Sequence, residues 1–172
     1  MNPEEAINLL REAGCSQDII EHCQTVAEYA CEIAEQYNRK HRRHDNPAPA
    51  DIELVTIGAL LHDIGRARSQ KIKHVVIGAK IARSLKLDER IVRIIERHIG
   101  AGIPKHEAVQ LGFPEGNYMP ETIEEKIVAH ADNLVDGSTR ISIGERLKRM
   151  KRRGFKRNVI RRMVKLHNAV ME

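Results

Sequence analysis

Signals that begin helices recur along this chain, and the segments between them carry apolar residues at helical spacing. Asn2 is placed to cap a helix, with Pro3 at the first helical position and Glu5 where a capping box needs a glutamate. Thr122 and Glu125 repeat the capping pattern later in the chain. No segment alternates apolar and polar residues as a half-buried strand would. The sequence therefore predicts an all-α fold, arranged as a single orthogonal or irregular helical bundle.

The predicted helices are joined by short connections, apart from two loops at 41–51 and 111–120. The first helix stops near Gly14, and the last segment is expected to break near Gly154. In chain order, the helices between them cover about 17–37, 52–63, a stretch beginning near His74, 88–100 with Asp88 as N-cap, and a stretch from Thr122. In the second helix the expected core face is Ile19, Cys23, Val26, Ala30, Ile33 and Ala34. In the helix that begins near residue 74 it is His74, Ile77, Gly78, Ile81 and Leu85.

The 172 residues suit one domain with one core, expected at about 17–140, followed by a basic helical segment at 141–172. Aromatic residues make up 3% of the chain and tryptophan is absent, so the core is expected to be aliphatic. No apolar run approaches the ~20 residues of a membrane helix. The acidic, amphipathic N-terminus is unlike a signal peptide. The expectation is a cytoplasmic protein with no membrane partner.

The cysteines are Cys15, Cys23 and Cys31. Their number is odd and no two form a CxxC pair. This pattern favours buried, reduced thiols over a disulfide or a sulfur-ligated metal.

Charge is distributed unevenly along the chain. Residues 146–165 hold 11 Lys and Arg residues and no acidic residue, whereas the rest of the chain carries the other 18 basic residues and all 24 acidic ones, a net charge of −6. The basic segment either binds a polyanion such as RNA or covers the core. Apolar residues at helical spacing favour the cover, and the residues expected to pack are Ile160, Met163, Val164 and Leu166.

An apolar turn, residues 58–61, runs directly into His62 and Asp63. Burying an imidazole costs free energy, and burying a carboxylate costs more unless it is paired or bound to a metal. In one interpretation Asp63 merely caps a helix or forms a salt bridge. In the other, the pair belongs to a metal site, because further metal-capable residues lie on or beside apolar helix faces: His22, His74, His98 and Asp132.

A shared divalent cation accounts for the whole set, because it binds neutral imidazoles and neutralises carboxylates. Ligands spread from residue 22 to residue 132 exclude a zinc finger. Donors limited to oxygen and nitrogen indicate Mn, Fe, Mg, Zn or Co. Six ligands are too many for one catalytic ion with an open position, so they predict two ions with Asp63 as the bridging carboxylate.

These residues resemble the H…HD…D signature of the HD superfamily of metal-dependent phosphohydrolases. HDIG at 62–65 is the spelling of a large subgroup, and His74 and His98 resemble the branches that bind two metals. Those branches include bacterial HD-type diadenosine tetraphosphate hydrolases and cyclic-dinucleotide phosphodiesterases. Small archaeal HDIG proteins show a similar overall pattern. The stretches that carry the resemblance are HVVIGAKIA (74–82), IERHIGAG (95–102) and VAHADNLVD (128–136). The resemblance covers about 17–140 and implies an HD-domain fold. The absence of a Gly-Tyr-Pro motif disfavours a signalling phosphodiesterase.

The resemblance also implies roles for single residues. One ion would take His22, His62, Asp63 and Asp132, and the second would take Asp63, His74 and His98. A water between two dications has its pKa lowered toward ~7 and can attack phosphorus as hydroxide, so Asp63 counts as catalytic. Arg66 follows HDIG where many relatives have lysine. Its guanidinium either holds a substrate phosphate or is a surface charge.

Other polar residues are expected outside the ligand set. His130 lies two residues before Asp132, about 200° round the helix. Asp136 either orients a water or ends a helix in solvent, and residues 100–108 form either a substrate-facing loop or a turn before a helix. The histidines expected at the surface are His41, His44, His106 and His167.

Two functions follow from the sequence. The first is a phosphohydrolase that cleaves a phosphoester or phosphoanhydride, most simply of a nucleotide, with metal-activated water. The alternative is an RNA- or polyanion-binding module with a regulatory or vestigial metal site. The complete ligand set favours the enzyme, because a decaying site would have gaps. The sequence leaves the substrate, the metal and the oligomeric state open.

Overall fold

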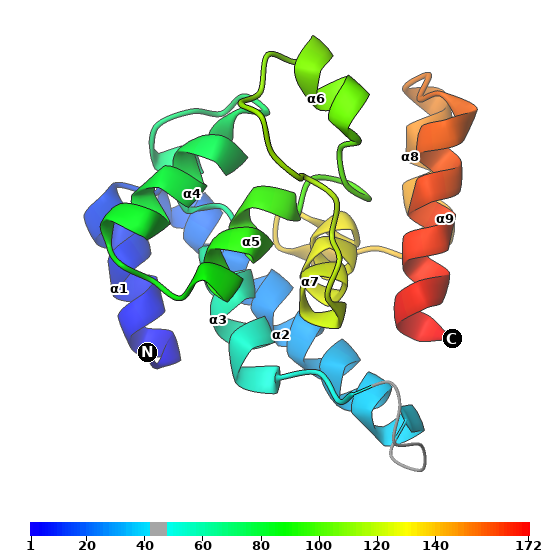
Figure 1. Cartoon of the computed structure of the whole chain (residues 1–172). Coiled ribbons are helices and arrows are strands. Elements are labelled where there is room, and N and C mark those ends of the chain that lie inside the picture. The colour runs from blue at the N-terminus through cyan, green and yellow to red at the C-terminus, as the bar shows by residue number, and fades with distance from the viewer. Residues whose placement is uncertain (42–47) are drawn as a thin grey trace.

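The computed structural model describes residues 1–41 and 48–172, and within them the predicted all-α fold is confirmed (Figure 1). The elements, in chain order, are α1 (Pro3–Ala13), α2 (Gln17–His41), α3 (Ile52–Leu61), the 3-10 turn η1 (Ile64–Ala67), α4 (His74–Ser84), α5 (Glu89–Arg97), α6 (Lys105–Gln110), α7 (Ile123–Asn133), β1 (Val135–Asp136), β2 (Thr139–Arg140), α8 (Ile143–Arg152) and α9 (Arg157–Met171). Most of the loop expected at 41–51 lies outside the described residues. Across the described residues, no helix has both the length and the apolar character needed to cross a bilayer.

The helix starts that the sequence predicts are confirmed by their hydrogen bonds. The Glu5 amide donates to the Asn2 side chain, and the Asn2 amide donates to the Glu5 carboxylate, which completes the capping box. Thr122 and Asp88 also accept from amides in the first turns of α7 and α5. The Glu125 half of the predicted capping box is wrong, because its carboxylate accepts from the Glu121 amide and pairs with Arg97 instead. The capping interactions are local, which is why a single sequence reveals them.

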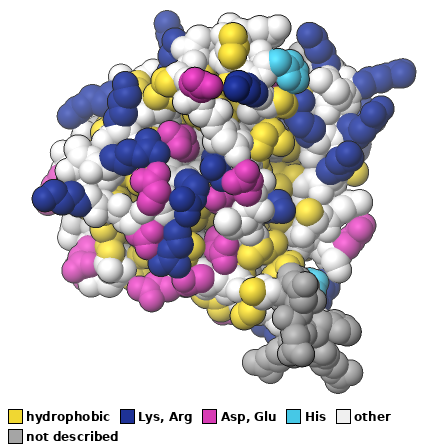
Figure 2. Space-filling model, viewed as in Figure 1, with side chains coloured by type: hydrophobic (Ala, Val, Ile, Leu, Met, Phe, Trp, Pro, Cys, Tyr) yellow, Lys and Arg dark blue, Asp and Glu magenta, His cyan; other side chains and the backbone are white. Residues whose placement is uncertain are grey.

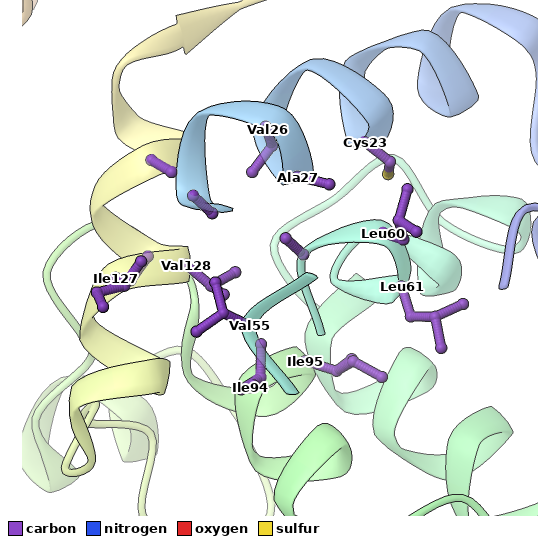
Figure 3. Close-up of a cluster of buried hydrophobic side chains, with 14 of the residues drawn as sticks. Cys23, Val26, Ala27, Val55, Leu60, Leu61, Ile94, Ile95, Ile127 and Val128 are labelled. Carbon is purple, nitrogen blue, oxygen red and sulfur yellow. The ribbon is translucent and has the colours of Figure 1, made fainter. Parts of the chain in front are cut away.

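Four helices, α2, α3, α5 and α7, bring their apolar faces together in the core (Figure 3). Leu61 and Ile95 are fully buried there, as are Val26 and Val128. Gly58 allows α3 and α5 to approach closely, because a Cβ at that position would meet the Cδ1 of Ile94 at 2.5 Å. The predicted aliphatic core is confirmed. All three cysteines are free thiols, with Cys15 and Cys23 buried and Cys31 half-buried.

The predicted core face of α4 is partly wrong. His74 and Gly78 are buried, but Ile77 and Ile81 are only half-buried and Leu85 is exposed. The remaining buried positions of α4 are Val75, Ala79 and Ala82. The helix turns its small residues inward because η1 and α5 lie close against it: a Cβ on Gly78 would meet Ile95 Cγ2 at 2.8 Å and Gly65 N at 3.1 Å.

A short hairpin after α7 was not predicted. Val135 of β1 pairs with Arg140 of β2, and Gly137 has a φ of +60° in the connecting turn. The Arg140 guanidinium forms a two-pronged ion pair with Glu32 of α2, at 2.7 and 2.8 Å. The hairpin is therefore fixed beside α2, and two-residue strands are too short to produce a visible alternation.

The basic segment forms α8 and α9, which the chain separates near Gly154 as predicted (Figure 1). Helix α9 packs on α7 through Met163, Leu166 and Val170, and Ile160 is half-buried. The prediction that Val164 packs is wrong, because its side chain is 37% exposed. Successive turns of α9 do not align all its apolar residues on one face, so Val164 falls on the solvent side.

Candidate metal centre

The six residues expected to bind metal lie together, most of them at helix ends. His62 is the C-cap of α3, Asp63 directly precedes η1, and His98 is the C-cap of α5. His74 begins α4, Asp132 lies in the last turn of α7, and His22 comes from the first part of α2. The helix crossings of the core thus bring together side chains that are up to 110 residues apart in sequence.

One group of donor atoms surrounds Asp132. Its Oδ1 lies 3.0 Å from His22 Nε2 and 3.5 Å from His62 Nε2. Asp63 Oδ2 lies 3.7 Å from His62 Nε2 and 4.0 Å from His22 Nε2. The donor atoms of His22, His62 and Asp132 all lie within 4.8 Å of one another, which is close enough for one ion.

A second group surrounds the other oxygen of Asp63. Asp63 Oδ1 lies 3.0 Å from His74 Nε2 and 3.4 Å from His98 Nε2, and the two Nε2 atoms are 3.2 Å apart. Donor atoms of His62, Asp63 and His98 also lie within 4.8 Å of one another. The Asp63 carboxylate therefore faces one group of donors with each oxygen, as a bridging ligand must.

All four histidines present the same ring nitrogen to the centre. The Nδ1 atom of His62 donates to the Ala59 carbonyl at 2.6 Å, and that of His98 donates to the Ile95 carbonyl at 2.9 Å. His74 uses the Lys71 carbonyl at 2.9 Å, and His22 uses the Gly137 carbonyl at 2.7 Å. Because a carbonyl can only accept, each Nδ1 carries the hydrogen, and in the neutral ring each Nε2 presents a lone pair.

This arrangement leaves polar atoms that need a cation. His62, His74 and His98 are at most 1% exposed and Asp63 is 3% exposed. Within the described residues, His62 Nε2 and Asp63 Oδ1 are buried without a hydrogen-bond partner. Lone pairs of neutral imidazoles that face a carboxylate oxygen at 3.0–3.4 Å repel it unless a proton or a metal ion lies between them. The residues present fit divalent cations.

The protonation tendencies follow from the same geometry. Burial disfavours the charged ring of His62, but Asp63, Cys23 and Asp132 together outweigh it and raise the pKa of His62. Burial opposes ionisation of Asp63, yet the surrounding imidazoles hold the pKa of that carboxyl well below its usual value. The pKa of Asp132 is also lowered: burial opposes ionisation there, but the neighbouring imidazoles of His22 and His62 outweigh it. Ionised carboxylates among imidazoles are the form that binds a cation.

Comparison with known proteins agrees with this geometry. The family described as HD domain matches residues 19–135. The chain belongs to the HD superfamily of metal-dependent phosphohydrolases. The fold agrees as well: the HD domain of the L. monocytogenes phosphodiesterase PgpH, solved in complex with cyclic-di-AMP, superposes with a TM-score of 0.58 at 16% identity, over 94% of this chain and 92% of that one.

Two curated relatives are more similar in sequence to this HD-domain chain. Protein MJ0778 of Methanocaldococcus jannaschii is 45% identical over 99% of this chain and 97% of its own length. The tRNA (cytidine(56)-2'-O)-methyltransferase of Thermoplasma volcanium is 46% identical over 96% of this chain. The match covers 46% of that methyltransferase, so the HD-domain chain spans about half its length.

Arg66 lies against the centre of the HD domain rather than in solvent. Its Nε donates to Asp63 Oδ2 at 2.5 Å, and its side chain is 29% exposed. The guanidinium binds one oxygen of the candidate bridging carboxylate through Nε, and the side chain remains partly exposed to solvent. A role of Arg66 in holding a substrate phosphate stays a prediction.

The residues expected outside the ligand set are placed as follows. His130 is fully buried on another side of α7, and its Nε2 lies 3.3 Å from Nδ1 of His167 in α9. The surface prediction for His167 is therefore wrong, because this contact half-buries it; His41 is also half-buried, while His106 is exposed. Asp136 is exposed in β1 and forms an ion pair with Arg149. His44 lies outside the described residues.

The segment 100–108 resolves into a turn followed by α6, and Lys105 pairs at the surface with Glu115. Two residues near the centre were not singled out from the sequence. Asn133 directly follows Asp132, and Arg146 of α8 donates to it at 3.1 Å. The sequence offered one signal for Asn133, a polar residue directly after the candidate ligand Asp132, but nothing local connects Asn133 with Arg146.

Proposed function

We propose that this protein hydrolyses a phosphoester or phosphoanhydride bond of a nucleotide, with a water molecule activated by two divalent cations. The observation that carries the proposal is the position of Asp63: each of its oxygens faces imidazole Nε2 atoms that have lone pairs to share. Asp63 Oδ2 also accepts from Arg66, but Oδ1 has no hydrogen-bond donor among the described residues, and a purely structural cluster would supply one.

The residues divide into two ligand sets that share one carboxylate. His22, His62, Asp63 and Asp132 would hold one ion, and Asp63, His74 and His98 would hold the other. Nitrogen and oxygen donors suit Fe, Mn, Co, Zn or Mg. Cations bound there would lower the pKa of water and neutralise the charge of a phosphate.

The protein's own groups prepare the site for that chemistry. Backbone carbonyls fix the four imidazole rings, so no side chain has to reorganise when a substrate binds. Arg66 fixes Asp63 through Oδ2, and its remaining N–H groups suit a phosphate oxygen. His22 and Asp132 are the partly exposed members of the set, so a substrate would reach the centre from their side.

A nucleotide is the proposed substrate because the structurally similar PgpH domain was solved with cyclic-di-AMP, and because the methyltransferase relative is named for tRNA. We also propose a cytoplasmic location, which suits three free thiols.

The test combines metal analysis with a substrate panel. Protein purified without chelator is analysed for bound metal, then supplied with Mn, Fe or Co and assayed on nucleotides, dinucleotides and simple phosphate esters. Asp63→Ala should lose both ions and all phosphate release, because Asp63 would touch both ions. The matched control is Asp18→Ala, which removes an exposed carboxylate from the first turn of α2. Full activity in Asp63→Ala, or no bound metal and no hydrolysis in the parent, would overturn the proposal.

A second candidate function, polyanion binding without turnover, is favoured by the exposed cations of α8 and α9. Figure 2 shows Lys and Arg side chains gathered along the upper right edge of the molecule, over these two helices. Phosphate-backbone binding by such a cluster falls steeply as salt rises. Filter binding of RNA across a salt series tests it: salt-sensitive capture by Asp63→Ala, with no hydrolysis by the parent, would favour this function over the enzyme.

A further inference from the structure

Arg146 of α8 is held beside the end of α7 by a chain of hydrogen bonds. Asn133 is 3% exposed, and its side-chain NH₂ group donates to the carbonyls of Ala129 and Gly100, both at 2.6 Å. Its Oδ1 is therefore fixed as an acceptor, and it receives the Arg146 Nη2 at 3.1 Å. Asn133 directly follows Asp132, and Gly100 lies two residues after His98. The guanidinium is thus positioned by the two chain segments that carry these candidate ligands.

The charge of Arg146 has no carboxylate partner among the described residues, although its side chain is half-buried. The neighbouring arginines of α8 differ in this respect: Arg149 pairs with Asp136 and Glu145, and Arg152 pairs with Glu145. In addition, the Nε atom of Arg146 is buried and has no hydrogen-bond partner among the described residues. An unpaired, partly desolvated guanidinium costs stability, and an anionic ligand bound to Arg146 would offset that cost.

The 3.1 Å hydrogen bond to Asn133, the residue after Asp132, places Arg146 near the candidate metal centre. Burial lowers the pKa of Arg146, and the Asp132 carboxylate is the strongest charge that opposes this effect. Arg149 follows Arg146 by three residues and Arg153 follows Arg149 by four, so the three share one face of α8. Arg149 reaches Asp136 in the hairpin, and the neighbouring Gly137 carbonyl holds His22. The arginine face of α8, defined as Arg146, Arg149 and Arg153, therefore borders the accessible side of the centre.

We propose that the arginine face of α8, with Arg146 at its inner end, binds a second phosphate group of the substrate, next to the phosphate at the metal centre. The inference rests on the proposed hydrolase function and narrows its substrate class to compounds with at least two phosphate groups. A guanidinium suits this role because its fork of N–H groups matches two phosphate oxygens. Nucleoside polyphosphates, dinucleotides and short RNA strands all carry the required second phosphate.

The experiment compares Arg146→Met with Lys148→Met in metal-loaded protein. Lys148 is exposed on the same helix, about 200° away from Arg146, so its replacement removes one positive charge from a different face. Binding of methylenediphosphonate, a probe with two phosphorus groups that resists hydrolysis, is measured by calorimetry. We expect Arg146→Met to weaken binding roughly 10- to 100-fold, as the loss of hydrogen bonds to a charged group implies, and Lys148→Met to change it less than about twofold.

Kinetics give an independent readout. Arg146→Met should raise KM for a substrate with two phosphates by a similar factor, leave kcat nearly unchanged, and leave hydrolysis of p-nitrophenyl phosphate, which has one phosphate, as in the parent. Arg146→Lys keeps the positive charge but loses the forked N–H groups of the guanidinium, so its KM should lie between those of the parent and Arg146→Met. It serves as the test variant if Arg146→Met does not fold. Dinucleotides and a short RNA, assayed side by side, identify which source of the second phosphate depends on Arg146.

The outcomes separate this inference from the proposed function. Equal binding of methylenediphosphonate by Arg146→Met and Lys148→Met, in a parent that binds metal and cleaves esters, overturns the inference alone. Equal loss of RNA affinity in Arg146→Met and Lys148→Met also overturns the inference, because RNA would then bind to the overall positive charge of α8 rather than to Arg146. A parent with neither metal nor esterase activity overturns the proposed function first.

Discussion

Gly65, in the HDIG stretch, leaves no room for a side chain. A Cβ built on Gly65 would meet the carbonyl oxygen of His74 at 1.9 Å and the amide nitrogen of Gly78 at 2.6 Å. Both atoms belong to the backbone of α4, so no side chain can rotate away. Because real Cβ contacts essentially never fall below 3.0 Å, Gly65→Ala must separate η1 from the start of α4 by about 1.1 Å.

That separation should act on one ligand set more than on the other. It moves His74, whose Nε2 lies 3.0 Å from Asp63 Oδ1. His22 belongs to α2 and Asp132 to α7, so neither is displaced. We expect Gly65→Ala to lose affinity for the second ion while it retains the first. Overpacking of this kind costs about 1–3 kcal/mol, which lowers Tm by about 2–12 °C for a domain of this size. A ligand displaced by about 1 Å can reduce the rate roughly 100-fold.

The assay pairs a calorimetric metal titration with thermal unfolding in chelator. Gly144→Ala is the matched control, because Gly144 lies in the first turn of α8 and a Cβ there would meet only Ser142 Oγ, at 3.8 Å. It should bind two ions and melt at or slightly above the parent's Tm. Two ions bound by Gly65→Ala with parental affinity, together with an unchanged Tm, would refute the reasoning.

Three further predictions concern stability and thiol chemistry. Arg97→Met should lower the free energy of unfolding by about 1.5–3 kcal/mol, because Glu125, which is 2% exposed, loses its 2.9 Å partner and keeps, as an ion pair, only the longer 3.6 Å contact with Arg93; urea unfolding measures this, and a change below about 0.5 kcal/mol would contradict it. Met163→Asp should destabilise the protein strongly in the same assay, whereas Val164→Asp should change it by less than about 0.5 kcal/mol, and equal effects would show that α9 packs differently. Burial raises the pKa of Cys15 from 9.0 to about 11, so the stability that the neutral thiol contributes should be present below pH 9 and fall as pH rises toward 11. At pH 8 its alkylation should be at least about 100-fold slower than in the unfolded chain, and rapid labelling of native Cys15 would disprove the assignment.

The sequence predicts the features that depend on neighbours along the chain. The capping residue Asn2 and the ending glycine Gly14 act within a few residues, so the bounds of α1 follow from the sequence alone. A different, non-local reason predicted that His22, His62 and Asp132 lie close together. Each was expected on or beside an apolar helix face, and a single core forces such faces to meet.

The features that sequence reasoning missed depend on which elements become neighbours. The inward face of α4 is fixed by the close approach of Gly65 and Gly78. Val75 is buried in a second cluster with Ile103 and Phe113, whereas Leu85 at the end of the helix is exposed. The contact between Arg146 and Asn133 joins residues 13 apart through the hairpin that separates α7 from α8. The spacing of apolar residues along the chain cannot predict such a contact, because it depends on how α7 and α8 pack against each other.

The helix ends explain why the candidate site could be found at all. The last carbonyls of a helix have no partner within it, and in α3 and α5 the carbonyls of Ala59 and Ile95 accept from the imidazoles of His62 and His98 instead. One hydrogen bond thus satisfies the end of the helix and fixes the tautomer that turns Nε2 toward Asp63. A histidine directly after an apolar helical run is therefore informative in this chain, because the same position that ends the helix also orients a metal ligand.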